Sequence, residues 1–159
     1  MISSDEVFNI YKSFEKKHKK EVRDINFLIQ PYNWKGPIEF KINDLEQLDV
    51  WVDFKQGSLT SKLTGEFTNR KAKNYANTII KNYDALKCSH PDYIEYLEKL
   101  RLFVLSTKPI PPILILEEST NKKNGNIVDG MHRIVTFLIL IYKHELPRDS
   151  TLIGYLGSK

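Results

Sequence analysis

The sequence has a single cysteine, Cys88, among its 159 residues. One cysteine excludes an internal disulfide and a cysteine-based metal cluster, and it suits a reducing compartment, so we expect a cytoplasmic protein. No stretch approaches the roughly 20 consecutive apolar residues that a membrane-spanning helix needs. Asp5 and Glu6 stand where a secretory signal would carry basic residues ahead of an apolar segment. These absences predict no disulfide, no membrane partner and no secretory leader.

Charge of neither sign dominates, because 24 Lys and Arg against 20 Asp and Glu leave a net charge of +4. That balance permits a nucleic-acid partner without requiring one. Neither the four histidines nor the acidic residues have the spacing of an intrinsic metal site, so we predict none. There is no internal repeat and no low-complexity tract. The length fits one domain spanning residues 1–159.

Hydrophobic periodicity divides the chain into helical and extended segments. The segments with helical spacing are residues 4–20, 67–86, 91–105 and 131–143, the first opening with a Ser3/Glu6 capping box. The segments with strand character are residues 25–29, 38–42, 113–116, 126–128 and 151–156. Loops are predicted at 30–37 and 57–65, and a turn or short helix that begins at 43–44 and leads to Trp51. This order predicts an α+β fold in which the strands at 113–116 and 126–128 form a hairpin.

Polar chemistry is concentrated in the sequence Asp129-Gly130-Met131-His132-Arg133, between a predicted strand and a predicted helix. A helix start exposes unpaired backbone N–H groups and the positive end of the helix dipole. An imidazole and a guanidinium at that position favour a phosphate or another anion. The alternative is a plain turn with a structural aspartate and a surface arginine, which we rank second.

The C-terminal half resembles the ParB/sulfiredoxin superfamily. The resemblance rests on the apolar strand at residues 111–116, a polar hairpin, and the stretch 127–133 followed by a hydrophobic helix. It covers residues 108–145 most directly. It implies a ParB/sulfiredoxin-like fold, a small mixed sheet packed with helices, over residues 38–159. Residues 1–37 would be an N-terminal extension containing a helix and a short strand.

The resemblance also implies roles in phosphate binding at the matching positions. Gly130 would let the backbone approach a phosphate because no side chain blocks it. Arg133 would clamp phosphate oxygens, and His132 would donate a hydrogen bond to them. Met131 would complete this phosphate-binding set. The implied ligand is ATP or another nucleotide, with Mg²⁺ arriving on the nucleotide rather than in a site of the protein's own.

Catalytic roles follow from the same resemblance. His132 would act as an acid or base, and Asp129 would accept from a substrate hydroxyl or help hold the metal on the nucleotide. Kinases of the superfamily use a glutamate near the first strand, and Glu46 lies in the corresponding region. We therefore take Asp129, His132 and Glu46 as the candidate catalytic residues. The most useful observation is whether they converge with Arg133 on one pocket.

Departures from the superfamily narrow the expected activity. Sulfiredoxins have a cysteine where this chain has Met131, and a thioether cannot act as the thiolate nucleophile. Chromosome-partitioning members carry an arginine-rich version of the turn and a downstream helix-turn-helix domain, and this sequence shows neither. The closest local match is to free serine kinases with "DGHHR". We therefore expect a nucleotide-binding phosphotransferase or NTPase, with a small molecule as its acceptor.

Two other classes of function stay open. Basic stretches at residues 16–20 and 70–73 suggest a DNA-binding protein, or an accessory protein in DNA modification or phage defence, although solvated helix faces explain both stretches more simply. A non-catalytic interaction module, such as a toxin, antitoxin or inhibitor, is the third class. The tyrosines on the predicted helices are assigned to packing ahead of base stacking; they are Tyr75, Tyr83, Tyr93 and Tyr96.

Overall fold

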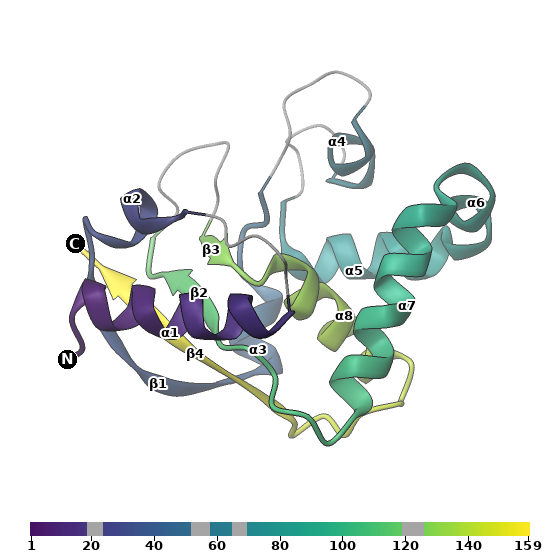
Figure 1. Ribbon diagram of the computed structural model, residues 1–159. Helices are drawn as coiled ribbons and strands as arrows, with labels where there is room; N and C mark the ends of the chain where they lie inside the picture. Colours follow the sequence, from purple (N-terminus) through teal and green to yellow (C-terminus); the bar gives the residue numbers. More distant parts are fainter. Residues whose placement is uncertain (19–23, 52–57, 65–69, 119–125) are drawn as a thin grey trace.

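The computed structural model describes residues 1–18, 24–51, 58–64, 70–118 and 126–159. Within these ranges the chain forms eight helices and four strands, which confirms the predicted α+β class (Figure 1). The helices are α1 (Ser4–His18), α2 (Asn26–Ile29), α3 (Ile42–Glu46), α4 (Leu59–Thr64), α5 (Ala72–Lys81), α6 (Tyr83–Ser89), α7 (Pro91–Leu105) and α8 (Met131–Tyr142). The strands are β1 (Asn33–Lys41), β2 (Ile113–Leu116), β3 (Ile127–Asp129) and β4 (Thr151–Ser158).

The four strands form one mixed sheet in the order β1-β4-β2-β3. β1 pairs antiparallel with β4, and β4 pairs parallel with β2. β2 and β3 pair antiparallel, as the predicted hairpin requires. The last strand of the chain therefore lies in the middle of the sheet, between the first strand and the hairpin.

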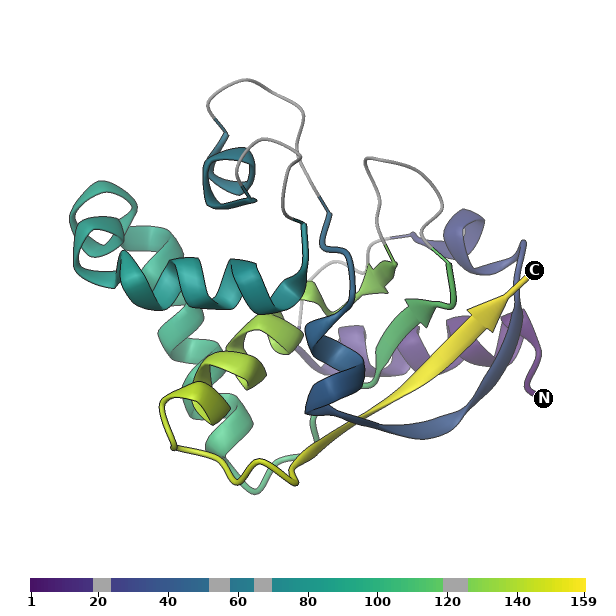
Figure 2. The ribbon, with the colours of Figure 1, turned by 180° about the vertical axis from the view of Figure 1, so that it is seen from behind.

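Helices cover both faces of this sheet, and β2 shows why they must. All four of its residues are buried. Ile113 and Ile115 belong to the larger core, which includes side chains of α5, α7 and α8. Leu114 and Leu116 belong to a second core, with side chains of α1 and α2. An unbroken apolar strand is what a sheet covered on both faces demands. Figures 1 and 2 show α1 against the sheet from its two sides.

Helix α8 lies at the centre of the larger core. Seven of its twelve residues are buried, and they are distributed around the helix rather than along one stripe. A helix that is apolar on every side must be enclosed. α8 contacts α3, α5, α7 and β2, which supply that enclosure. None of the helices in the described part of the chain combines the length and apolar character needed to cross a membrane.

Segments with strong local signals lie where the sequence predicts them. The structure places α7 at 91–105 and β2 at 113–116, the predicted bounds. The capping box of α1 is present: the Glu6 N–H donates to Ser3 Oγ at 3.2 Å, and the Ser3 N–H donates to Glu6 Oε2 at 2.8 Å. These hydrogen bonds satisfy N–H groups at a helix start, which have no partner within the helix.

The short segments are predicted less well. The strand expected at 25–29 is wrong, because this segment is helix α2, whose first N–H donates to Asp24 Oδ1 at 3.0 Å. The loop expected at 57–65 contains α4, where Ser58 Oγ accepts from the Ser61 N–H at 3.1 Å and starts the helix. In both cases a short polar side chain outweighs the apolar or loop-like composition.

Two boundaries also differ from expectation. The helix expected at 67–86 is two helices. α5 ends at Lys81, and the next residue, Asn82, donates from both its N–H and its side-chain amide to the Thr78 carbonyl. Residues 67–69 lie outside the described chain. β1 begins at Asn33, so the loop expected at 30–37 is shorter than predicted. The boundary expected at residue 38, between the N-terminal extension and the rest of the fold, falls inside this strand.

The two-sided sheet makes a stability prediction. Leu114→Ala should lower the free energy of unfolding by about 2–4 kcal/mol, because it leaves a cavity between β2 and the α1–α2 layer. Ile153→Ala on β4 is the matched control, since that side chain is 52% exposed, and its cost should stay below about 1 kcal/mol. Urea unfolding of both variants measures the difference. Equal costs would show that the α1–α2 layer does not bury this face.

Candidate functional site

The connection between β3 and α8 is a turn that only glycine can make. We call residues 129–133 the 129–133 turn. Gly130 has φ 100° and ψ 15°, in the left-handed region. A Cβ there would lie 2.7 Å from Ile113 Cγ2 and 3.0 Å from Arg133 Nη2. The backbone torsion and the surrounding space therefore both exclude a side chain at this position.

Arg133 forms hydrogen bonds that link the two sides of this turn. Its Nη2 donates to Asp129 Oδ2 at 2.9 Å and to the Pro112 carbonyl at 3.2 Å. Both side chains of the ion pair are only 14% exposed. We call these three groups the Arg133 latch. It joins the end of β3, the residue before β2 and the first turn of α8, so it fixes the direction in which α8 leaves the sheet.

Three backbone N–H groups are left without an acceptor inside the helix at the start of α8. The first hydrogen bond of the helix runs from the Ile134 N–H to the Gly130 carbonyl at 3.0 Å. The N–H groups of Met131, His132 and Arg133 precede it. Gly130 occupies the capping position and has no side chain with which to cap them. This is the arrangement of donors and dipole that binds anions.

His132 is held between two tyrosines of α7. Its ring packs edge-to-face on Tyr93 at 5.7 Å and on Tyr96 at 5.3 Å between centroids. Tyr93 is fixed in turn by a 2.8 Å hydroxyl–hydroxyl contact with buried Tyr75. Burial lowers the pKa of His132 below its ordinary value, so the imidazole is neutral at pH 7. A neutral imidazole offers one donor and one acceptor nitrogen.

Glu46 does not join the 129–133 turn. It is the last residue of α3, and its Oε2 accepts from the Tyr142 hydroxyl at 2.6 Å. Tyr142 ends α8, about 16 Å beyond Met131 at roughly 1.5 Å per residue. Glu46 therefore does not converge with Asp129 and His132 on one pocket. Glu46 instead ties α3 to the far end of α8, where burial and this carboxylate raise the pKa of Tyr142.

The basic cluster at 70–73 is largely engaged in structural contacts. Lys71 Nζ lies 2.9 Å from Asp49 Oδ1 and 2.9 Å from the Gln47 carbonyl. Arg70 Nη2 donates to the Val50 carbonyl at 3.3 Å. Both cations therefore hold the segment that follows α3. The other basic stretch, 16–20, extends beyond the described residues at its C-terminal end.

The sequence analysis did not predict the partners of His132 and Arg133. Tyr93 and Tyr96 are three residues apart on a correctly predicted helix, so their shared face was available from the spacing alone. That this face packs on His132 depends on how α7 packs on α8, and no local sequence pattern predicts that packing. The Pro112 carbonyl, as a backbone group, leaves no signal in the sequence. In the described part of the chain no three His, Cys, Asp or Glu side chains come together as metal ligands.

Comparisons with protein-family models, with curated proteins and with solved structures find no match to this chain. The ParB/sulfiredoxin resemblance therefore stays a prediction that rests on the residues of the turn and of β2. The geometry described above stands independently of it.

The Arg133 latch makes a testable stability prediction. Asp129→Asn should lower the free energy of unfolding by about 1.5–3 kcal/mol, because it leaves a mostly buried guanidinium without its charged partner. Glu95→Gln is the matched control: it breaks another i,i+4 pair, with Lys99, whose side chains are 66% and 74% exposed. That loss should stay below about 0.5 kcal/mol. Indistinguishable urea midpoints would contradict a structural role for the latch.

The lowered pKa of His132 gives a pH prediction. Protonation is easier in the unfolded chain, so stability is complete above the ordinary pKa of about 6.5 and falls as pH drops from there to the folded pKa. His132→Gln should reduce this slope, and His144→Asn, at a φ of 60° that asparagine tolerates, should keep it. Urea unfolding of the three proteins, measured at several pH values below about 6.5, tests this prediction. A His132 ring that titrates at or above about 6.5 by NMR would refute the argument.

Proposed function

We propose that this chain binds a nucleotide through its phosphates at the 129–133 turn, and that it transfers or hydrolyses a phosphoryl group there. One observation carries the proposal: left-handed Gly130 opens α8 with three N–H groups that lack helical acceptors, beside a neutral imidazole. Anionic oxygens are the ligands that such a helix start favours, and glycine lets them approach the backbone.

Each residue of the turn has a distinct part in this proposal. Gly130 provides the space, and Met131 contributes its backbone N–H rather than its side chain. His132 is fixed by Tyr93 and Tyr96, so its ring presents a donor and an acceptor in one orientation. A neutral imidazole near the phosphate serves as a hydrogen-bond donor or as an acid or base, according to which nitrogen carries the proton.

Because Arg133 and Asp129 bind each other in the latch, their roles in the proposal are linked. Arg133 Nη2 is already bonded to Asp129 and to the Pro112 carbonyl. A phosphate that recruits this guanidinium therefore competes with the Asp129 carboxylate. The Asp129 oxygen that Arg133 releases would then accept from a substrate hydroxyl or contact Mg²⁺. Magnesium in such sites keeps water and phosphate oxygens and needs only one or two carboxylates. Asp129 fits that requirement.

Glu46 has no part in this step, because its carboxylate binds Tyr142 at the other end of α8. Asp129 and His132 are therefore the two groups that would handle protons at the turn. Positioning and charge neutralisation by the helix start would supply most of the rate effect, as is general for phosphoryl transfer.

Calorimetry with ATP, ADP and CTP, with and without Mg²⁺, tests the proposal. We expect at least one nucleotide to bind more tightly than millimolar. His132→Gln should weaken that binding by about tenfold, since it removes an oriented donor next to the phosphate. His144→Asn, a histidine substitution outside the site, should leave affinity unchanged. If His132 acts as an acid or base, its variant should also release phosphate from ATP about 10²–10⁴ times more slowly.

Circular dichroism and urea unfolding establish that the variants are folded before binding is compared. If none of the three nucleotides binds more tightly than millimolar, with or without Mg²⁺, the proposal is wrong. Equal weakening by His132→Gln and His144→Asn would also place the binding site elsewhere.

A further inference from the structure

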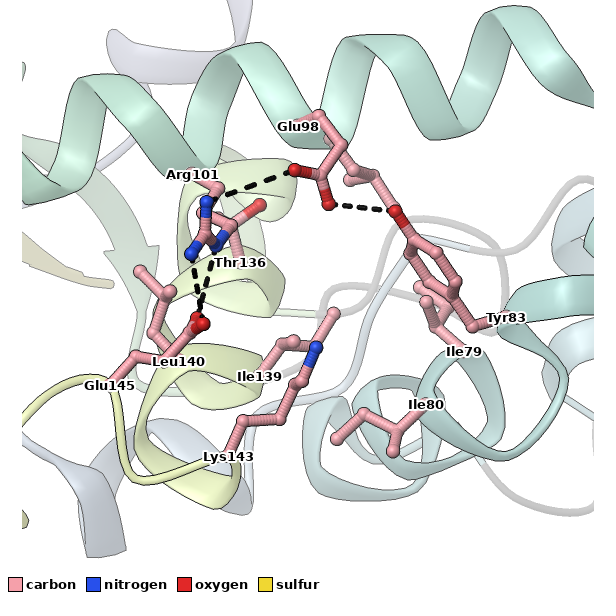
Figure 3. A pocket seen from close by; sticks show the side chains of 11 residues that line it. Ile79, Ile80, Tyr83, Glu98, Arg101, Thr136, Ile139, Leu140, Lys143 and Glu145 are labelled. Carbon is pink, nitrogen blue, oxygen red and sulfur yellow. Dashed lines mark hydrogen bonds and ion pairs between the residues drawn. The ribbon is translucent and has the colours of Figure 1, made fainter. Parts of the chain in front are cut away.

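A cavity of about 140 Å³ lies along the C-terminal half of α8, away from the 129–133 turn. We call it the α7–α8 cavity. Its apolar lining comes from three helices: Ile79 and Ile80 of α5, Leu97 of α7, and Ile139 and Leu140 of α8. Figure 3 shows these elements around the space, with polar side chains along part of its edge.

Most of the polar edge is internally satisfied. Arg101 forms two hydrogen bonds with Glu145, at 2.9 and 3.0 Å, and its Nη1 lies 3.9 Å from Glu98. Glu98 also accepts from the Tyr83 hydroxyl at 2.7 Å. Burial and Glu98 raise the pKa of Tyr83 to about 12, so Tyr83 remains a donor at neutral pH. Both glutamates at the edge of the cavity therefore already have donors.

Two groups of the lining are exceptions. The buried Thr136 Oγ1 has no hydrogen-bond partner within the described residues. The Lys143 Nζ lies 5.8 Å from the centroid of the Tyr83 ring and forms no ion pair in this part of the chain. Figure 3 shows its side chain reaching in among the lining residues. The cavity thus combines an aliphatic interior with an ammonium that lies near an aromatic face and has no direct ion pair among the described residues. The nearby Glu145 carboxylate is bound by Arg101, and Lys143 contributes to lowering the pKa of Glu145.

We propose that the α7–α8 cavity binds a small organic monocarboxylate, with its single aromatic ring or branched alkyl body among the aliphatic side chains and its carboxylate on Lys143. The volume sets the size of the body, because an apolar cavity of about 150 Å³ accommodates benzene. The charge sets the head group: a cationic ligand would have to displace Arg101 or Tyr83 from the glutamates, whereas a carboxylate meets an ammonium that forms no ion pair among the described residues. With one such cation, the site favours one carboxylate over two.

This site is independent of the proposed nucleotide site. Thr136 is the α8 residue of the cavity closest in sequence to the turn, and it lies a full helical turn beyond His132. Lys143 follows the last residue of α8. Binding in the cavity does not need the three N–H groups at the start of α8. If those groups fail to bind phosphate, the cavity proposal still stands.

Titration of the full-length chain with benzoate, followed by ¹H–¹⁵N NMR, tests the proposal. Benzyl alcohol and benzylamine serve as the neutral and cationic probes with the same ring. We expect saturable shifts of the amides of Ile139 and Lys143, with benzoate binding about tenfold more tightly than benzylamine. Absence of saturable shifts with benzoate up to tens of millimolar, or tighter binding of benzylamine, would overturn the proposal.

Three variants separate the contributions of charge and volume. Lys143→Met keeps an unbranched apolar stem and should weaken benzoate by about tenfold while leaving benzyl alcohol unchanged. Lys81→Met removes an exposed charge from the end of α5, outside the cavity lining, and should change neither. Ile139→Phe fills the space and should weaken both probes. Unchanged benzoate affinity in Lys143→Met or Ile139→Phe would rule out this binding mode.

Discussion

The hydrogen bonds from Arg133 to Asp129 and to the Pro112 carbonyl determine how the rest of the structure is arranged. They join β3, the entry to β2 and the first turn of α8 at a glycine that admits no side chain. Because α8 is buried on all sides, its direction fixes the positions of α3, α5 and α7 around it. A stable ion pair that is largely shielded from water is well suited to this role, since losing either partner leaves the other charge uncompensated.

α8 has different chemistry at its two ends as a consequence. Its start carries three backbone N–H groups without helical acceptors, next to the ring of His132. Its far end is closed by the Tyr142–Glu46 hydrogen bond, and Lys143 beyond it faces an aliphatic cavity. Between its ends the helix carries mostly apolar core side chains, and Thr136, Ile139 and Leu140 also line the cavity. One rigid helix therefore positions two separate polar regions, and a ligand at either of them would contact the same buried element.

The sequence predicted the fold best where periodicity extended over a long segment or where a strand was continuously apolar. Helix 91–105 and strand 113–116 satisfy those conditions, and their bounds were found. The predictions for 25–29 and 57–65 were wrong, and in each segment a short polar side chain, Asp24 or Ser58, accepts from a backbone N–H in the first turn of the helix that forms. Such local hydrogen bonds compete with apolar composition in short segments, where few residues favour either outcome.

The candidate site was predictable in part for a similar reason. Residues 129–133 are consecutive, so their turn could be anticipated from the glycine and from the strand and helix beside it. Glu46 could not be placed this way, because its distance from the turn depends on where α3 meets α8. The tyrosine pair around His132 likewise depends on packing between helices. The plain-turn alternative predicted a structural aspartate, and the ion pair of Asp129 with Arg133 agrees with that part of it. Both residues have a structural function whether or not phosphate binds.

The most direct test of the central claim is a ¹H–¹⁵N NMR titration with Mg²⁺ and ATP, read at the backbone amides of α8. We expect the largest shifts at Met131, His132 and Arg133, where the N–H groups have no acceptor in the helix, and little change in the amides near Lys143. Saturable shifts confined to other parts of the chain, or no shifts at the start of α8, would contradict it.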